Sequence, residues 1–341
     1  MGHSVTTRRP GIREVAQRAG VGAASVSRVL SNHPEVSDRM RHRVLAAVAE
    51  LGYEPDIVAR GLRSRTTSSV GFVLSDISNP LLSAIVRGAE AVLRAAGYSM
   101  LLTNSEDSPD LDARHLRQLR QRRVDGLILL PAAEDDASTL RQLSSIDVPA
   151  VIIDRDLPPD LTASYVLSDH RSGMRDAVED LLQLGHRRFA IVLGRNVRPS
   201  RERLSAVQHT IATASGTSLA VEAGTLSVTH GREALQRLLN RAKPHRPSAV
   251  ILGGNQLLVG ALETIRAHQV RLGADLSLIS CDDVPLARLF QPPISVVARD
   301  PEQTGRAAAE LLLGQITHKG GVDTIVLPTW YTPRQSHGTA T

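Results

Sequence analysis

The stretch GVGAASVSRVL, Gly20 to Leu30, decides the fold of the N-terminal part of the chain. It contains one charged side chain, no aromatic side chain and a run of small residues. Before it, apolar or small residues recur with the spacing of one helix face, at Ile12, Val15, Ala16 and Ala19. Gly20 suits the left-handed end of a helix, and a second apolar stripe follows at Val26, Val29 and Leu30. Two short helices joined by a glycine-containing turn predict a helix-turn-helix.

The second of these helices has an outer face of small side chains. A recognition helix lies in the major groove of DNA, and small side chains let its backbone come close to the base edges. Ser27 and Arg28 can donate hydrogen bonds to bases or phosphates, and alanine methyl groups can contact thymine. An ordinary helical hairpin with an alanine-rich solvent face is the alternative. The predicted DNA contacts of this segment are Gly22, Ala23, Ala24, Ser25, Ser27, Arg28 and Asn32.

The positive charge of the chain is concentrated in the same region. The 341 residues carry a formal net charge of +5. Residues 1–65 contain eleven arginines against six acidic residues, whereas the remainder has 29 basic and 29 acidic residues. This asymmetry indicates a polyanion-binding head on a neutral body, although a basic tail without function would have the same charge. One such motif per chain reads only a half-site, so we expect a homodimer on a near-palindromic operator.

A third helix and a linker follow the motif. Ser37 is the predicted N-cap, Gly52 the predicted end, and one apolar face is expected from Val44, Leu45, Val48 and Leu51. The combined segment, IREVAQRAGVGAASVSRVLSNHPEVSDRMRHRVLAAVAELGYEPDIVARGLRS, resembles the headpiece and hinge of the lactose-repressor (LacI/GalR-type) family of bacterial transcription regulators. The resemblance continues to about residue 336. It implies a hinge helix over 57–63 that folds only on DNA and only in the dimer.

The resemblance also assigns DNA contacts in the hinge. Leu62 matches the leucine that wedges into the minor groove and kinks the operator. Ala59 and Arg60 match hinge positions that meet the floor and wall of that groove. Gly61 replaces a better helix former and should make folding of the hinge costlier by about 1 kcal/mol relative to alanine.

The rest of the chain alternates β-rich runs with helical patterns. VGFVL, YSMLLTN, DGLILLP and PAVIID form one series, and RRFAIVLG, SAVILGG and LSLISCDD form a second series after about residue 168. Such alternation predicts an α/β body of two lobes, each with a parallel sheet built from βαβ units. The resemblance implies the same architecture, similar to periplasmic binding proteins.

These patterns and the resemblance divide the chain as follows. We expect a helix-turn-helix headpiece over 1–54, a hinge and linker over 55–67, an effector-binding and dimerisation domain over 68–336 and a tail over 337–341. Within the body, the first lobe should comprise 68–166 and 297–327, and the second lobe 167–296 and 328–336.

Ligands of parallel α/β sheets bind beyond the carboxyl ends of the strands, so two facing lobes place the site in the cleft between them. Polar residues directly after predicted strands, including Arg155, are therefore candidates for binding hydroxyl groups of a sugar-like effector. The resemblance supports Asp154, Arg203 and Asp282 most strongly and aligns apolar Leu81, Leu82 and Leu226 with positions that carry aromatic residues in many sugar-binding members. The predicted effector-binding residues are Ser75, Asp76, Asn79, Leu82, Asp154, Arg203, Leu226, Asn255, Gln256 and Asp282.

Other functions have weaker support in the sequence. P-loop, HExxH, CxxC, GxSxG and GxGxxG motifs are absent, and we expect no catalytic residue, metal or cofactor. The start of the chain lacks a secretory signal, no apolar run is long enough to span a membrane, and the only cysteine is Cys281, so we expect a cytoplasmic protein. The alternatives are a solute-binding protein and a sugar-related enzyme with a fused DNA-binding head.

Overall fold

The computed structural model describes residues 10–30, 33, 35–53, 66–317 and 320–340. Its contacts divide the chain into Met1–Thr67, which comprises the headpiece and the linker, and Ser68–Thr341, the body. The predicted DNA contacts Asn32, Ala59, Arg60 and Leu62, and the predicted hinge helix, lie outside the described residues.

The described headpiece contains three helices: α1 (Ile12–Ala19), α2 (Ala23–Leu30) and α3 (Asp38–Leu51). Gly20 ends α1 in the left-handed conformation, with φ 63° and ψ 42°, and the N–H of Val21 donates to the carbonyl oxygen of Ala16 at 3.0 Å. Arg43 on α3 fastens this turn, because its guanidinium donates to the carbonyl oxygens of Ala19 and Gly20. The angle between α1 and α2 is therefore held by backbone caps and by one side chain of the third helix.

A small core joins the three helices. Its buried side chains are Val15, Ala16, Ala19, Val26, Val29, Val44 and Ala47. The prediction that Leu45 shares the apolar face of α3 is wrong, because Leu45 is 48% exposed and Ala47 is buried instead. Residue 45 lies one step around the helix from the 44–47–48–51 stripe. Ser37 does precede α3, but its side chain makes no capping hydrogen bond.

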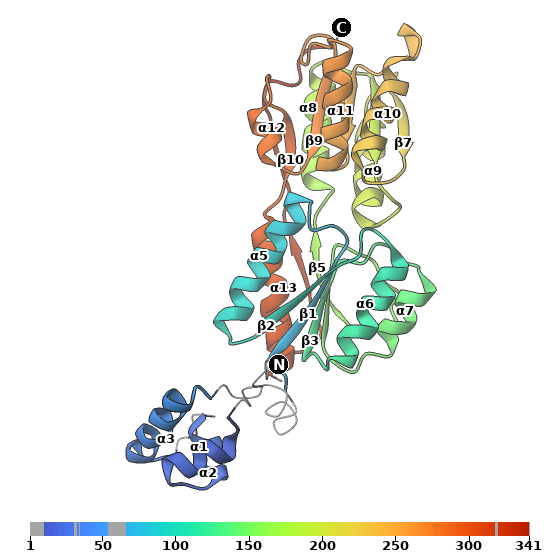
Figure 1. Cartoon of the computed structure of the whole chain (residues 1–341). Coiled ribbons are helices and arrows are strands. Elements are labelled where there is room, and N and C mark those ends of the chain that lie inside the picture. The colour runs from blue at the N-terminus through green and yellow to red at the C-terminus, as the bar shows by residue number, and fades with distance from the viewer. Residues whose placement is uncertain (1–9, 31–32, 34, 54–65, 318–319, 341) are drawn as a thin grey trace, which may run out of the picture. The chain divides into compact units, whose positions relative to one another are not determined.

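The body has two sheets of the same topology (Figure 1). The first lobe orders its strands β11-β5-β4-β3-β1-β2, all parallel. The second orders β12-β10-β9-β8-β6-β7, in which β12 alone is antiparallel to its neighbour. The strands are β1 (Ser69–Leu74), β2 (Ser99–Asn104), β3 (Gly126–Leu129), β4 (Ala150–Ile153), β5 (Ser164–Ser168), β6 (Arg188–Leu193), β7 (Ser218–Ala223), β8 (Ala249–Leu252), β9 (Ser277–Cys281), β10 (Ser295–Ala298), β11 (Thr324–Leu327) and β12 (Trp330–Thr332).

The chain crosses between the lobes three times, after β5, after β10 and after β11. Strand β5 runs to Ser168 and β10 to Ala298, so two of the three predicted lobe boundaries fall two residues early, inside strands, and the third directly follows Leu327, the last residue of β11. The sequence patterns had not marked β5, β7 or the helix α13 (Pro301–Ile316). The first two are short or half-exposed strands, and the third lies beyond the second crossing.

Helices cover both faces of each sheet. In the first lobe α5 (Pro80–Ala95) packs with α13, and α6 (Pro109–Gln121) packs with α7 (Ala137–Ser144). In the second lobe α8 (Ser172–Gln183) packs with α9 (Arg198–Ile211), and α10 (Val228–Leu239) packs with α11 (Asn255–Ala267). The one-turn helix α12 (Pro285–Leu289) and the 3₁₀ turn η1 (Lys243–His245) complete the set. Every central strand is thereby buried on two sides, which explains its continuous apolar sequence.

Both lobes pack one helix pair through reciprocal glycines. A Cβ atom at Gly305 of α13 would lie 1.9 Å from the carbonyl oxygen of Ile85, and one at Gly88 of α5 would lie 2.1 Å from that of Glu302. In the second lobe, Gly231 of α10 and Gly260 of α11 meet the facing backbone in the same way, at 2.3 and 1.9 Å. The two helices of each pair therefore approach more closely than any larger residue would permit.

We expect Gly305→Ala to destabilise the body by about 1–3 kcal/mol, because the added methyl group meets backbone that cannot move aside. Gly314 on the same helix has open space around its Cβ position. Gly314→Ala should therefore be neutral, or stabilising by up to about 1 kcal/mol through helix propensity. Thermal unfolding of both variants measures the difference. Equal effects would show that the close crossing of α5 and α13 is not required.

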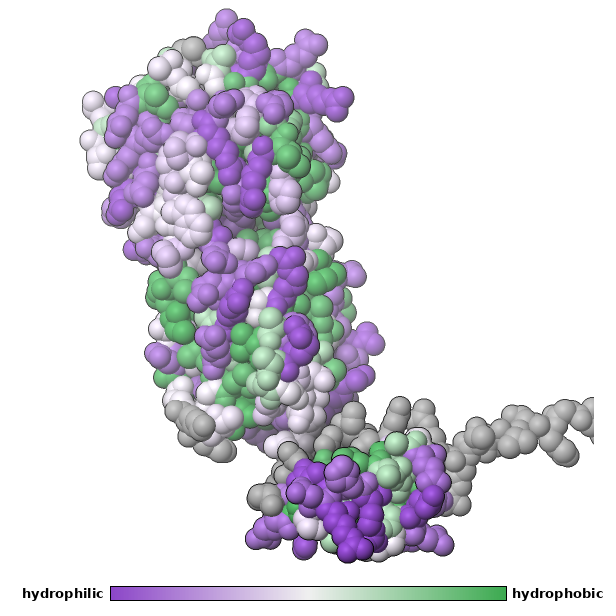
Figure 2. Space-filling model, turned by 90° about the vertical axis from the view of Figure 1, so that its left-hand side faces the viewer, coloured by the Kyte–Doolittle hydropathy of each residue, from purple (hydrophilic) through white to green (hydrophobic). Residues whose placement is uncertain are grey.

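The surface of the described part of the chain is of mixed character. Figure 2 shows the side on which α5 and α12 lie, where hydrophobic side chains are interspersed with hydrophilic ones. The most exposed large apolar side chain is Leu289 of α12, at 78%. Within the described residues, no helix combines the length and apolar character needed to cross a membrane.

Candidate functional site

The first candidate site is the outer face of α2 in the headpiece. Val26 and Val29 point into the core, and the other side of the helix is left open. Gly22, Ala23, Ala24 and Arg28 are exposed, and Ser25 and Ser27 are half-buried. Gly22 stands at the N-terminal end, where its carbonyl oxygen accepts from the N–H groups of Ser25 and Val26 at 2.9 and 3.2 Å. This face offers a nearly bare backbone, two hydroxyls and one guanidinium.

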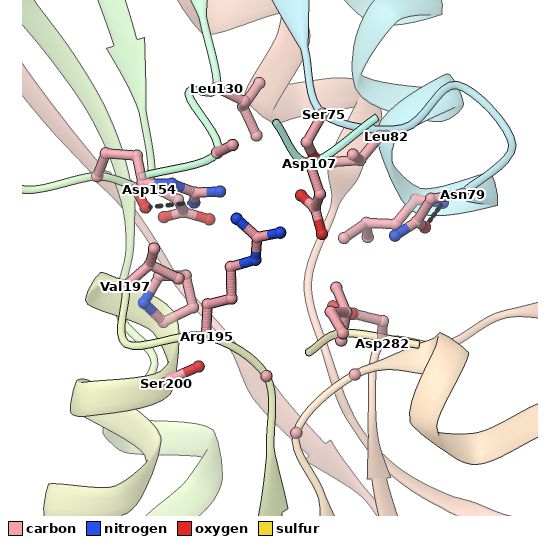
Figure 3. Close-up of a pocket in the computed structure, with 18 of the residues that line it drawn as sticks. Ser75, Asn79, Leu82, Asp107, Leu130, Asp154, Arg195, Val197, Ser200 and Asp282 are labelled. Atoms are coloured by element: carbon pink, nitrogen blue, oxygen red, sulfur yellow. Dashed lines mark hydrogen bonds between the residues drawn. The ribbon is translucent and has the colours of Figure 1, made fainter. Parts of the chain in front are cut away.

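The second candidate site is a cavity of about 90 Å³ between the lobes of the body (Figure 3). It lies at the carboxyl ends of the strands of both sheets, as expected for this architecture. Seven of the ten predicted effector residues line it: Ser75, Asn79, Leu82, Asp154, Arg203, Leu226 and Asp282.

Two aspartates occupy equivalent places in the two lobes. Asp154 directly follows β4, and Asp282 directly follows β9. Both have left-handed backbone, with φ values of 48° and 71°, and both donate their N–H to a neighbouring strand, at Val166 and Val297. Non-glycine residues in this conformation concentrate at functional sites, and aspartate tolerates it better than most residues. The repeated fold thus aims one carboxylate from each lobe at the cavity.

Arg299 joins these two carboxylates across the lobes. It follows β10 at the second crossing, and its side chain is 9% exposed. Its Nε lies 3.1 Å from Oδ1 of Asp282, and its Nη1 pairs with Oδ2 of Asp154. Burial acts to lower the pKa of Arg299, but the two carboxylates outweigh it and raise the pKa, so the guanidinium stays charged. A buried ion triad therefore spans the interlobe boundary.

Further polar groups complete the surroundings of Asp154. Ser168 donates its N–H to Oδ1 at 2.6 Å and its hydroxyl to Oδ2 at 3.0 Å, and Nε2 of His170 lies 3.5 Å from Oδ2. Burial and the nearby Arg203 charge lower the pKa of His170 to about 4, so the imidazole is neutral at pH 7. Burial acts to raise the pKa of Asp154, but neighbouring positive charge and these hydrogen bonds hold it well below its usual range. At neutral pH the positive charge comes from Arg299.

Arg203 lies on α9, close to Asp282. Its Nη1 donates to the carbonyl oxygen of Gly253 at 2.7 Å, and its Nη2 lies 3.9 Å from Oδ1 of Asp282. The ion pair is long, so Arg203 retains donors directed at the cavity. Arg203 and Asp282 both belong to the second lobe and line the cavity side by side.

The remaining three predicted effector residues, Asp76, Asn255 and Gln256, lie beside the cavity and not on its wall. The amide of Asn255 donates to the Asn79 side chain at 2.7 Å, and the amide of Gln256 donates to the Asp76 carboxylate at 2.5 Å. Their side chains are thus engaged with one another across the lobes. These two hydrogen bonds connect the N-terminal end of α11 to the loop before α5.

Apolar contacts shape the second-lobe wall. A Cβ atom at Gly254 would lie 2.6 Å from Cδ1 of Leu226, so the leucine side chain fills the place that a residue other than glycine would need. The lining residues of the cavity include no aromatic side chain. The groups available to contact a ligand are therefore the ends of polar side chains.

The sequence interpretation missed three charged residues that line the cavity: Asp107, Arg195 and Arg299. Each stands a few residues beyond a strand, after β2, β6 and β10 respectively. The signal that selected Asp154 would have found Asp107 and Arg195, which follow strands that the sequence marked, but not Arg299, because its strand β10 was not marked. Within the described residues, no group of three or more histidine, cysteine, aspartate or glutamate side chains could hold a metal ion.

Comparison with known proteins finds a matching family model for each part of the chain that carries a candidate site. Residues 11–56 match the model of bacterial regulatory proteins of the lacI family, and residues 178–337 match the periplasmic binding protein-like domain. The HTH-type transcriptional repressor PurR of Haemophilus influenzae is 30% identical over 314 residues, which cover 90% of this chain and 91% of that protein.

The solved structures that are similar to this chain are also transcriptional regulators. The lac repressor dimer bound to operator and the anti-inducer ONPF has a TM-score of 0.84 and 25% identity, with coverage of 96% of this chain and 99% of that chain. The transcriptional regulator CelR–cellobiose complex has a TM-score of 0.71 and 30% identity, with coverage of 96% and 100%. With its helix-turn-helix and its effector-binding type of body, the chain therefore belongs to the LacI family of bacterial regulatory proteins and is a transcriptional regulator.

Proposed function

We propose that the protein is a cytoplasmic repressor that binds an operator as a homodimer and responds to a small polyhydroxylated effector between the lobes of its body. It performs no catalysis. The similarity to a repressor dimer on its operator and to a regulator in complex with cellobiose supports this function. A solute-binding protein would have no use for the α2 surface, and the similar proteins named above are transcriptional repressors and regulators rather than enzymes.

The observation that carries the proposal is the pair of strand-end carboxylates from opposite lobes around one cavity. Hydroxyl groups of a polyol donate well to carboxylates and accept from Arg203. A ligand that touches both lobes binds more tightly when they are closed, and only such a difference in affinity can shift the conformational equilibrium. The body is thus suited to convert effector binding into a change of lobe arrangement.

Site residues and domain limits are part of the proposal. We assign operator contacts to Gly22, Ala23, Ala24, Ser25, Ser27 and Arg28, with Asn32, Ala59, Arg60 and Leu62 added by the family resemblance. The division at residue 67 between headpiece with linker and body is supported by the contacts within each part. Asp154, Arg203 and Asp282 are the proposed effector contacts, together with Ser75, Asn79, Leu82 and Leu226 on the wall, whereas Asp76, Asn255 and Gln256 support the closed arrangement.

Sedimentation of the full chain with operator-containing duplexes, enriched from a random pool, tests the DNA-binding half of this proposal. We expect two chains per duplex and a near-palindromic consensus, because each chain supplies one recognition helix. Affinity should fall steeply with salt, since arginines that replace counterions drive the association. A single chain per duplex at micromolar concentration, or an affinity independent of salt, would contradict the proposal.

A further inference from the structure

Arg195 is a cation in the cavity without a counter-ion. It follows β6 in the second lobe, and its guanidinium projects into the space between the lobes (Figure 3). Among the described residues its side chain has no hydrogen bond and no ion pair. We propose that the effector carries an anionic oxygen group, a carboxylate or a phosphate, which Arg195 binds. This inference rests on the proposed effector function and specifies the chemical class of the ligand.

Two of the three carboxylates that line the cavity already have positive partners. Asp154 and Asp282 share Arg299, and Asp282 also has Arg203 within 3.9 Å. The remaining lining carboxylate is Asp107, which forms no ion pair with any described residue. No carboxylate of the described residues therefore lies within ion-pair distance of Arg195.

Arg155 adds a second positive charge on the opposite wall. It follows β4 in the first lobe and is 9% exposed. Its hydrogen bonds go to two backbone carbonyl oxygens, of Pro131 at 2.7 Å and of Asp154 at 2.9 Å, and none goes to a carboxylate. Four arginines and three aspartates line the cavity, so the wall carries an excess of positive charge. The charge of Arg155 is compensated only at longer range, by carboxylates that include Asp154, Glu134 and Asp107.

Two arginines near the cavity, unlike Arg195, have acidic partners. Arg201 pairs with Glu134 at 2.6 Å and with Asp156 at 2.8 Å, and Arg198 pairs with Asp156 at 3.1 Å. The protein thus supplies acidic partners to the neighbouring guanidinium groups of α9 and leaves Arg195 without one. A general excess of arginine does not account for this difference.

The positions of the two cations fit a bridging ligand. Arg195 belongs to the second lobe and Arg155 to the first, so an anion between them contacts both lobes. The hydroxyls of Ser75 and Ser200, 7% and 9% exposed, also line the cavity and have no hydrogen-bond partner among the described residues. Guanidinium forks and hydroxyl donors match carboxylate and phosphate oxygens, whereas a neutral sugar would leave the excess charge in place.

Isothermal titration of the full chain with matched ligands tests this inference. The probes are ribose, ribonate and ribose 5-phosphate, the corresponding glucose series of glucose, gluconate and glucose 6-phosphate, and inorganic phosphate alone. We expect at least one anionic polyol to bind roughly 10- to 100-fold more tightly than its neutral parent, since hydrogen bonds to charged groups contribute this much. The acid and the phosphate of each series show which anion is preferred.

Arg195→Gln should abolish that preference and leave the affinity for the neutral parent within about 3-fold. Arg198→Gln is the matched control: it removes one positive charge from the same region, but one that Asp156 already neutralises, and it should keep the preference. Equal affinity for neutral and anionic members, or an unchanged preference in Arg195→Gln, overturns the anionic inference while effector binding stands. If no member of either series binds, the proposed effector function falls with it.

Discussion

Arg299→Met is expected to lower the free energy of unfolding of the body by about 3–5 kcal/mol, because it leaves the buried Asp154 without a charged partner and Asp282 with only the long ion pair to Arg203. Asp154 and Asp282 are 2% and 4% exposed, so water cannot replace the guanidinium. Trp330 is the only tryptophan of the chain and lies on β12, paired with Ala298 next to Arg299. Its fluorescence during urea unfolding therefore reports on this part of the body.

Two further variants separate the buried charge from loss of an arginine in general. Arg306→Met removes an exposed partner of Glu302 on α13 and should cost less than about 0.5 kcal/mol. Adding Asp154→Asn to Arg299→Met should restore part of the lost stability, because the carboxylate that has lost its charged partner disappears. A cost below about 1 kcal/mol for Arg299→Met alone would show that other groups compensate both carboxylates.

Arg203→Ala is expected to produce a protein that binds operator normally but no longer responds to effector. The side chain is 6% exposed and lies at the cavity wall, so its loss removes charge-assisted hydrogen bonds to the ligand and leaves Asp282 with Arg299 as its remaining partner. Effector affinity should fall at least roughly 30-fold, and operator affinity should stay within about 3-fold. Calorimetry and operator binding measure the two quantities on the same preparation.

The competing explanation is that Arg203 only holds Asp282 in place. In that case effector affinity would be unchanged in Arg203→Ala, the cavity would be the wrong site, and the assignments of Asp154 and Asp282 would fail with it. Arg232→Ala serves as the control, because this arginine pairs with Glu263 on the surface of the second lobe, away from the cavity wall. It should change neither affinity.

The sequence patterns predicted those elements whose burial is recorded in the spacing of apolar residues. Continuous apolar runs such as VGFVL and AVIL are required for strands buried under helices on both faces, and they marked the central strands of both sheets. Val26 and Val29 marked the buried side of α2 for the same reason, which left its small residues exposed. The strand-end rule then located Asp154 and Asp282, since the carboxyl ends of parallel strands share one edge.

Long-range arrangement explains what the patterns missed. Arg299 bridges the lobes only because the chain crosses between sheets just after β10, and local spacing carries no record of that crossing. Asn255 and Gln256 were interpreted as ligand contacts, but each faces a residue of the other lobe some 180 positions away in the sequence. The absence of an ion pair at Arg195 likewise depends on where the acidic side chains lie in the folded body, and the spacing of residues along the sequence does not show this.

The central claim is that a ligand between the lobes changes the affinity of the headpiece for its operator. The most direct test is fluorescence anisotropy of a labelled operator duplex, titrated with the full chain at saturating ribose 5-phosphate, gluconate or whichever probe of the two series binds most tightly, and without it. The account predicts an operator Kd that differs between the two conditions by about 5- to 150-fold, and no difference in Arg203→Ala. An identical Kd with the cavity occupied and empty in the unmodified protein would contradict the account.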